Sequence, residues 1–268
     1  MIGSSARAVV DGFEVASGYN STDNQTVIGL PSPGTDDEWN GPWDKQSGNE
    51  ARMVSSSDYF YEGSRSLKME NSSLELSRPV DSNINGGLAN PKHWIDVYAY
   101  VPSVSMDSTL KFTFYVSTAS NEKKESAAFQ AQWNSTDGRV NWYVWDGDPT
   151  ETWVNTGVAV ATNTWVHLLI EMDMMAKTYT AYVEMNQVAS ATTLDFGDGA
   201  GSTASTTNIT AVGFNRTGSS GTKDVYFDAL GIRPRVPEVP SWIAMAGFLM
   251  AGVVPVWLRR RMEASASG

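Results

Sequence analysis

The chain has 268 residues, a formal net charge of −11 and no cysteine. The negative charge argues against nucleic acids and other anionic partners, whose phosphates require a basic face, and the absence of thiols excludes disulfides, thiolate metal sites and a cysteine nucleophile. Charged residues make up 18% of the chain and aromatic residues 11%, which suits a secreted β-protein whose partners are neutral glycans better than one that binds charged polymers.

The first residues carry one element of an export signal. Ala6-Arg7-Ala8 has the small-x-small spacing of a cleavage site, without the apolar stretch that should precede it. We therefore expect residues 1–10 to be the remnant of an export signal, or disordered, and the folded domain to begin at Asp11.

Up to residue 90 the hydrophobic pattern is irregular. Short alternations predict three strands, at Gly12–Ala16, Arg65–Glu70 and Leu74–Ser77. Residues 19–48 are rich in Pro, Gly, Asp and Asn, which predicts long loops. Trp39 and Trp43 lie in these loops and form one candidate pair for stacking on a sugar ring; the alternative is that they fill the core.

From residue 94 onward apolar and polar residues alternate, as in strands with one buried face. The clearest unit is a hairpin of Ala128–Trp133 and Arg139–Trp145 around the turn Asp137-Gly138. Its core face is predicted to hold Phe129, Ala131, Trp133, Val140, Trp142 and Val144. Its opposite face is predicted to hold Gln130, Gln132, Asn141, Tyr143 and Trp145. Aromatic rings stack on sugars and planar amides pair with their hydroxyls, so these five residues are a second candidate carbohydrate site, unless this face is also core.

Further strands are predicted at Lys111–Val116, Trp165–Met174, Thr178–Met185 and Asp224–Ile232, and a flexible polar connection at residues 201–207. No amphipathic helix is apparent before residue 236. The fold class is therefore all-β, and closely spaced strands predict a two-sheet antiparallel sandwich.

The segment from Asp11 to Ile232 resembles the concanavalin A-like, laminin-G-like jelly rolls that are common in bacterial surface proteins. The order of five short segments carries the resemblance: Asp11–Glu14, Glu62–Lys68, Trp94–Ser103, Trp165–Asp173 and Val225–Ile232. It implies one jelly-roll domain over residues 11–232. Jelly rolls of the galactose-binding type share the first, second and last of these segments and are the alternative.

The resemblance also implies a structural Ca²⁺ ion that joins the first and last strands. Carboxylate oxygens suit this hard cation, and Glu14 and Asp228 occupy the matching positions, with Asp11 as a possible third ligand. The alternative is that these acids only cap turns.

Laminarinase-type glycosidases of the same superfamily carry a Glu-x-Asp-x-x-Glu motif, or a form one residue shorter. Glu171 and Asp173 match its first two acids, but the third position falls on Met175 or Ala176. Retaining hydrolysis needs a second carboxyl group as general acid, so we expect no catalytic residue here. The two histidines are far apart in sequence and no Gly-x-Ser-x-Gly elbow occurs, which leaves a non-enzymatic protein as the expectation.

The C-terminal segment predicts a membrane helix. The uncharged apolar run Trp242–Leu258 is followed at once by Arg259, Arg260 and Arg261. Its length lies at the short end of the roughly 17–25 residues that span a bilayer, and arginines stay on the cytoplasmic side. The segments expected are a Pro-rich linker at 233–241, a transmembrane sorting helix with its arginine cluster at 242–261, and a disordered tail at 262–268.

This order of acidic turn, short helix, arginine cluster and early end resembles the PEP-CTERM sorting signal of bacterial exosortase substrates. Pro237 and Glu238 match the family's Pro-Glu-Pro core, whose second proline is displaced here to Pro240. The resemblance implies an exported protein, anchored in the membrane at least transiently, recognised by an exosortase-type enzyme and delivered to the cell surface or extracellular matrix. A plain tail anchor and a buried core helix are the alternatives.

These features predict a non-enzymatic, exported jelly-roll protein that binds or scaffolds extracellular polysaccharide. One alternative is a glycan-cleaving enzyme, hydrolase or lyase, which requires acids, or Tyr, His and Arg, clustered in one groove. The other is a purely structural matrix protein without a ligand, which predicts no exposed aromatic cluster.

Overall fold

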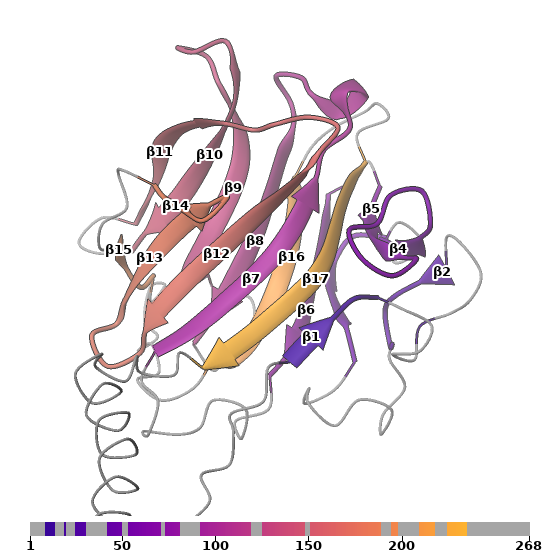
Figure 1. Cartoon of the computed structure of the whole chain (residues 1–268), viewed down its shortest axis with the longest axis horizontal. Coiled ribbons are helices and arrows are strands. Elements are labelled where there is room, and N and C mark those ends of the chain that lie inside the picture. Colours follow the sequence, from indigo (N-terminus) through magenta and orange to yellow (C-terminus); the bar gives the residue numbers. More distant parts are fainter. Residues whose placement is uncertain are drawn as a thin grey trace, which may run out of the picture. The chain divides into compact units, whose positions relative to one another are not determined.

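The computed structural model of the chain describes residues 9–13, 19, 25–30, 42–49, 53–70, 73–80, 92–118, 125–147, 151–188, 194–197, 209–217 and 224–234. These residues form two antiparallel β-sheets that pack face to face (Figure 1), which confirms the expected all-β sandwich. Their helical structure is one 3₁₀ turn, η4 (Ser103–Ser105), and no helix among them is long and apolar enough to cross a membrane. The predicted membrane helix at 242–261 lies outside the described residues.

The larger sheet has ten strands. Its order is β14 (Asn186–Gln187), β13 (Thr178–Val183), β12 (Trp165–Asp173), β7 (Lys92–Tyr100), β17 (Val225–Pro234), β5 (Ser66–Met69), β4 (Met53–Ser56) and β2 (Gln25–Thr26). In addition, β1 (Val9–Asp11) pairs with β17 and β15 (Leu194–Asp195) pairs with β13.

The smaller sheet has seven strands. Its order is β11 (Thr152–Ala159), β10 (Arg139–Asp146), β9 (Ala127–Asn134), β8 (Lys111–Ser117), β16 (Ala211–Thr217), β6 (Leu74–Pro79) and β3 (Asp44–Ser47). The edge strand β11 pairs with β10 through a register shift between Asn141 and Tyr143, and Gly157 within it has a φ of 74°.

Aromatic side chains join the two sheets. Phe227 of β17 is fully buried, and its ring lies 4.3 Å from that of Phe214 and 5.6 Å from that of Phe112, both on the smaller sheet. Trp142 packs edge-on against Phe112 and Phe129. Because truncating a buried Phe costs about 3–5 kcal/mol, such inter-sheet contacts can hold the sandwich together without disulfides.

Trp43 is a core residue, which corrects its prediction as a sugar-stacking ring. Its side chain is fully buried, packs on Phe13 and Phe214, and donates its indole N–H to the Tyr19 hydroxyl at 2.8 Å. The turn-rich sequence around it suggested an exposed loop, but the backbone of Trp43 bridges to Ile28 and leads directly into β3. Trp39, its predicted partner, lies outside the described residues.

Candidate functional site

The five residues predicted to share the polar face of the hairpin lie on one face of β9 and β10. In β9 and β10, Gln130 stands opposite Tyr143 and Gln132 opposite Asn141, so these side chains share the outer face of the smaller sheet with Trp145. The alternate residues of both strands, including Phe129, Ala131, Val140, Trp142 and Val144, belong to the hydrophobic core. Period-two alternation therefore identified both faces correctly.

The neighbouring edge strand adds two residues that the sequence analysis did not include. Trp153 of β11 pairs with Trp145 and Asn155 pairs with Tyr143, and the two indole rings lie 5.1 Å apart. All four side chains are half-buried. The sequence signal that could have identified them is the alternation of Trp153 and Asn155 with valine and threonine, which is typical of a strand. We call the surface formed by Gln130, Gln132, Asn141, Tyr143, Trp145, Trp153 and Asn155 the amide–aromatic face.

Two amides form the floor of the amide–aromatic face. Gln130 is 3% exposed and donates its Nε2 to Thr113 Oγ1 at 2.9 Å. Asn141 is fully buried and donates its Nδ2 to Asp137 and, at 3.2 Å, to Asn155 Oδ1. Within the described part of the chain, Gln130 Oε1, Asn141 Oδ1 and Trp145 Nε1 are buried atoms without a hydrogen-bond partner. An unpaired buried polar atom costs about 1–3 kcal/mol, and these three atoms, two acceptors and the indole N–H donor, lie beneath the surface. The amides at the surface of the face are the half-buried Gln132 and Asn155.

Acidic residues border the same face beyond β8. Tyr115 is fully buried and its hydroxyl lies 3.4 Å from Glu75 Oε1. Its ring covers Gly213, where a Cβ would come within 2.3 Å of Tyr115 Cζ. Burial, and then Glu75 and Glu125, raise the pKa of Tyr115 well above its ordinary value. Burial also raises the pKa of Glu125 above its ordinary value.

Glu171 and Asp173 lie on the other sheet, facing outward from β12. Asp173 accepts the backbone N–H of Ala176 at 3.0 Å and pairs with Lys92 at 3.4 Å. Glu171 accepts the hydroxyl of Tyr182 at 3.1 Å. Both carboxylates therefore fix a turn or a neighbouring strand.

The two histidines are also held in place by neighbours. His167 pairs through Nε2 with Asp96 Oδ2 at 3.0 Å, and Arg233 contacts the same oxygen at 3.1 Å. His93 is 1% exposed. Tyr98 stacks on the His167 ring at 4.6 Å.

Asp228, one predicted calcium ligand, is fully buried and accepts three backbone N–H groups. Tyr61 and Glu62 donate to its Oδ2 at 2.7 and 3.1 Å, and Ala229 donates to its Oδ1 at 2.7 Å. Glu14 and the side chain of Asp11 lie outside the described residues, and the described chain contains no group of three or more acids or histidines arranged to hold a metal. Calcium binding by these acids stays a prediction. The sorting-signal residues Pro237, Glu238 and Arg259 to Arg261 likewise lie outside the described residues.

Sequence comparison identifies the family. A laminin-G-like profile of the concanavalin A-like lectin/glucanases superfamily matches residues 95–233, more than half of the chain. The chain belongs to this superfamily. The matched segment of this superfamily member runs from β7 into β17 and includes every residue of the amide–aromatic face. No curated protein matches the chain in sequence.

Solved structures align with the chain at low identity. A sialidase aligns with a TM-score of 0.50 and 10% identity. The alignment covers 86% of this superfamily member and 19% of the sialidase chain. The binding domain of botulinum neurotoxin DC, solved with rat synaptotagmin II, aligns with a TM-score of 0.47 and 10% identity over 79% of this chain and 48% of its own. The chain spans less than half the length of either protein, and at these identities the likeness concerns the fold alone.

Proposed function

We propose that this superfamily member is a non-enzymatic glycan-binding protein and that the amide–aromatic face holds a neutral polysaccharide. The observation that carries the proposal is the juxtaposition of half-buried aromatic rings with half-buried amide side chains. Tyr143, Trp145 and Trp153 supply adjacent ring surfaces, and the half-buried amides of Gln132 and Asn155 lie beside them on the same face. Rings stack on sugar C–H groups and amide oxygens accept sugar hydroxyls.

The charge of the chain selects among polysaccharides. With 30 acidic against 19 basic residues, and with Glu75 and Glu125 beside the face, a polyanionic glycan would be repelled. A neutral glycan avoids this cost. The proposed partner class is therefore a neutral extracellular polysaccharide.

The binding proposal is tested with the full chain in mild detergent. Affinity electrophoresis in gels containing laminarin, galactomannan or xylan should retard the protein, and alginate should not. Tyr143→Ala and Trp153→Ala should each weaken retention about tenfold, which corresponds to roughly 1.4 kcal/mol. Met175→Ala, which removes a 66% exposed apolar side chain from a turn, is the matched control and should bind as the wild type. Unchanged retention of both ring variants would refute the assignment of this face.

A second candidate function, glycan cleavage, is favoured by one observation. Glu125 has a raised pKa caused first by burial, as a general acid requires, and it lies near the buried Tyr115. Reducing-end assays in the same samples test this alternative. If the wild type produces new reducing ends and the Glu125→Gln variant does not, the function is glycan cleavage and not binding alone.

The C-terminal segment completes the proposal. We infer that it acts as a sorting signal of the PEP-CTERM type, which places the jelly roll outside the cell and makes an exosortase-type enzyme its processing partner. The support is the order of Pro237-Glu238, the apolar run and Arg259 to Arg261. Intact-mass measurement of the protein from a host with and without the exosortase tests this. If the chain has the same unshortened mass in both hosts, processing by the exosortase is excluded and the segment is a plain membrane anchor.

A further inference from the structure

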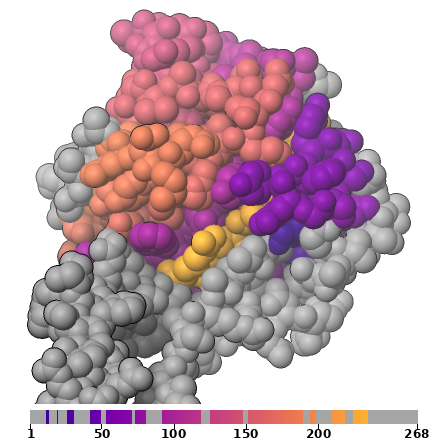
Figure 2. All heavy atoms as spheres, viewed as in Figure 1, coloured from indigo at the N-terminus to yellow at the C-terminus, as the bar shows by residue number. Residues whose placement is uncertain are grey.

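The outer face of the ten-stranded sheet carries three consecutive exposed aromatic residues. Tyr59, Phe60 and Tyr61 belong to the loop between β4 and β5 and are 39%, 44% and 44% exposed. In Figure 1 this loop curls over the sheet, and Figure 2 shows its atoms, in violet, on the surface of the same face. Contiguous exposed aromatic surface on a folded domain usually marks a binding site.

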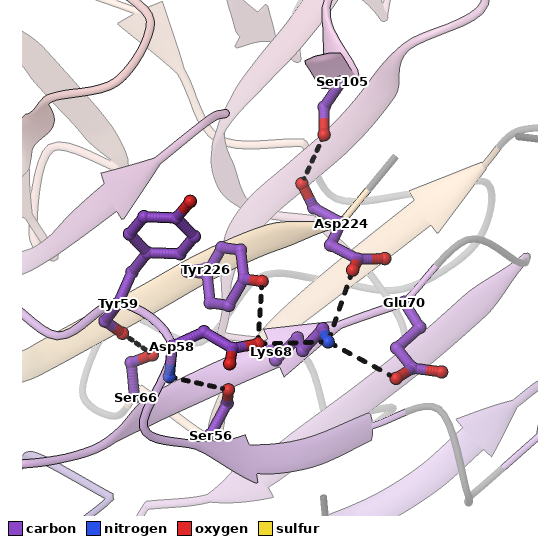
Figure 3. A network of polar contacts seen from close by, with 9 residues as sticks. All are labelled: Ser56, Asp58, Tyr59, Ser66, Lys68, Glu70, Ser105, Asp224 and Tyr226. Atoms are coloured by element: carbon purple, nitrogen blue, oxygen red, sulfur yellow. Dashed lines mark hydrogen bonds and ion pairs between the residues drawn. The ribbon is translucent and has the colours of Figure 1, made fainter. Parts of the chain in front are cut away.

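The loop is fixed by its backbone rather than by burial of its rings. The buried carboxylate of Asp228 accepts the N–H groups of Tyr61 and Glu62. Ser56 Oγ accepts the N–H of Asp58 at 3.1 Å, and the Ser66 hydroxyl donates to the carbonyl of Tyr59 (Figure 3). These bonds hold the aromatic residues at the surface, although the hydrophobic effect favours their burial.

Rings on the sheet support those on the loop. Tyr59 stacks on Tyr100 with centroids 4.4 Å apart, and Tyr61 stacks on Tyr98 at 3.5 Å. Trp165 contacts Tyr100 and Tyr61 at 5.3 and 6.2 Å. We call Tyr59, Phe60 and Tyr61, with the supporting Tyr98, Tyr100 and Trp165, the tyrosine platform. Its rings are thus ordered before any ligand arrives, which lowers the entropy cost of binding.

Polar groups surround the platform. The ammonium of Lys68 lies 3.3 Å from Asp58 and from Asp224 and 3.6 Å from Glu70 (Figure 3). Tyr226 donates its hydroxyl to Asp58 at 3.3 Å, and burial, followed by Asp58 and Asp224, raises its pKa. The hydroxyl therefore keeps its proton. Carboxylates outnumber the one ammonium of this network, so a neutral, hydroxyl-rich ligand suits the platform and a polyanion does not.

We propose that the tyrosine platform is a second sugar-binding surface and that the domain bridges two neutral polysaccharide chains. The inference rests on the proposed function of the amide–aromatic face. The two surfaces lie on the outer faces of different sheets of one sandwich, so they point in opposite directions and cannot engage the same stretch of polymer. One folded domain then cross-links the matrix without forming a dimer.

The experiment uses beads coated with laminarin or galactomannan and the full chain in mild detergent, shown to be monomeric by light scattering. The wild type should agglutinate the beads. Phe60→Ala combined with Tyr61→Ala should remain bound but lose agglutination, and Tyr143→Ala combined with Trp153→Ala should do the same. Combining all four substitutions should abolish binding, and Met175→Ala should behave as the wild type.

The outcomes separate the two proposals. If the platform variant agglutinates beads as well as the wild type, or if the Tyr143→Ala, Trp153→Ala variant loses all binding, the second surface is refuted while the first stands. If the wild type binds no bead, both proposals fail. The single variant Phe60→Ala guards against misfolding, because this side chain is 44% exposed; with an unchanged melting temperature it should still reduce agglutination severalfold.

Discussion

Replacing Asp228 by alanine should detach the loop between β4 and β5, which carries Tyr59, Phe60 and Tyr61, and should destabilise the sandwich. The fully buried carboxylate accepts two N–H groups from the loop, at 2.7 and 3.1 Å, and one from the adjacent Ala229. Hydrogen bonds to charged groups contribute about 1.5–3 kcal/mol each. Taking the lower value for the two loop bonds alone gives a loss of about 3 kcal/mol. For a domain of this size, that corresponds to a fall in melting temperature of about 6–12 °C.

Thermal and urea unfolding followed by near-ultraviolet circular dichroism measure this effect. Asp228→Asn should lower the free energy of unfolding by about half as much as Asp228→Ala. Its amide oxygen can still accept the N–H groups of the loop, whereas its NH₂ group would face the N–H of Ala229 and cannot accept it. Asp58→Ala is the control within the same loop, since its side chain is 53% exposed and surface ion pairs contribute about 0–1 kcal/mol. A melting temperature of Asp228→Ala within 2 °C of the wild type, or an equal fall in Asp58→Ala, would refute the reasoning.

Three further predictions concern the core, pH and calcium. Tyr19→Phe removes the acceptor of the buried Trp43 indole N–H and should lower the free energy of unfolding by about 1–3 kcal/mol; a change below about 0.5 kcal/mol in urea titrations would contradict this. Burial first, and then nearby acids, raise the pKa of Tyr226 above its ordinary value of 10.0, so the unfolded chain releases this proton at lower pH than the folded chain and stability should fall as pH rises above about 10. Tyr226→Phe should weaken that fall between pH 9 and 11.5, and an identical profile would rule out this contribution. If Asp228, Glu14 and Asp11 hold calcium, the domain should melt at a higher temperature in millimolar Ca²⁺ than in chelator. At a hundredfold excess of Ca²⁺ over Kd, the free energy of unfolding rises by about 2.7 kcal/mol. Identical melting curves would contradict a calcium site in the domain.

Local alternation was sufficient to predict the five residues of the amide–aromatic face that lie on β9 and β10. In β9 and β10 the side of each residue follows from period two, so Gln130 and Tyr143 were placed on the same face from sequence, and the structure pairs them directly. Alternation in β11 indicates a strand there, but the pairing of Trp153 with Trp145 and of Asn155 with Tyr143 depends on a register shift between Asn141 and Tyr143, which a local pattern does not predict.

Contacts distant in sequence account for what was missed. The tyrosine platform depends on Asp228, which stands 167 residues after Tyr61, and on rings from β7 and β12. Trp43 was assigned to a loop because its neighbours are turn residues, whereas its partners Tyr19 and Phe214 come from segments far along the chain. The first described strand is Val9–Asp11. The predicted strand Gly12–Ala16 falls partly outside the described residues, and at Phe13 the backbone has a positive φ of 56°, which is incompatible with an extended strand at that residue.

The edge strand β11 affects how copies of this chain can pack at high concentration. An exposed edge offers unpaired N–H and C=O groups on which a second copy could add a strand, the first step toward fibres. Here the side chains of Asn155 and Thr156 accept the N–H groups of Gly157 and Val158 at 2.9 and 3.1 Å, and Arg139 donates to the carbonyl of Gly157 at 3.3 Å. With these groups occupied and Gly157 in a left-handed conformation, this part of the edge is a poor template for a further strand from a second molecule.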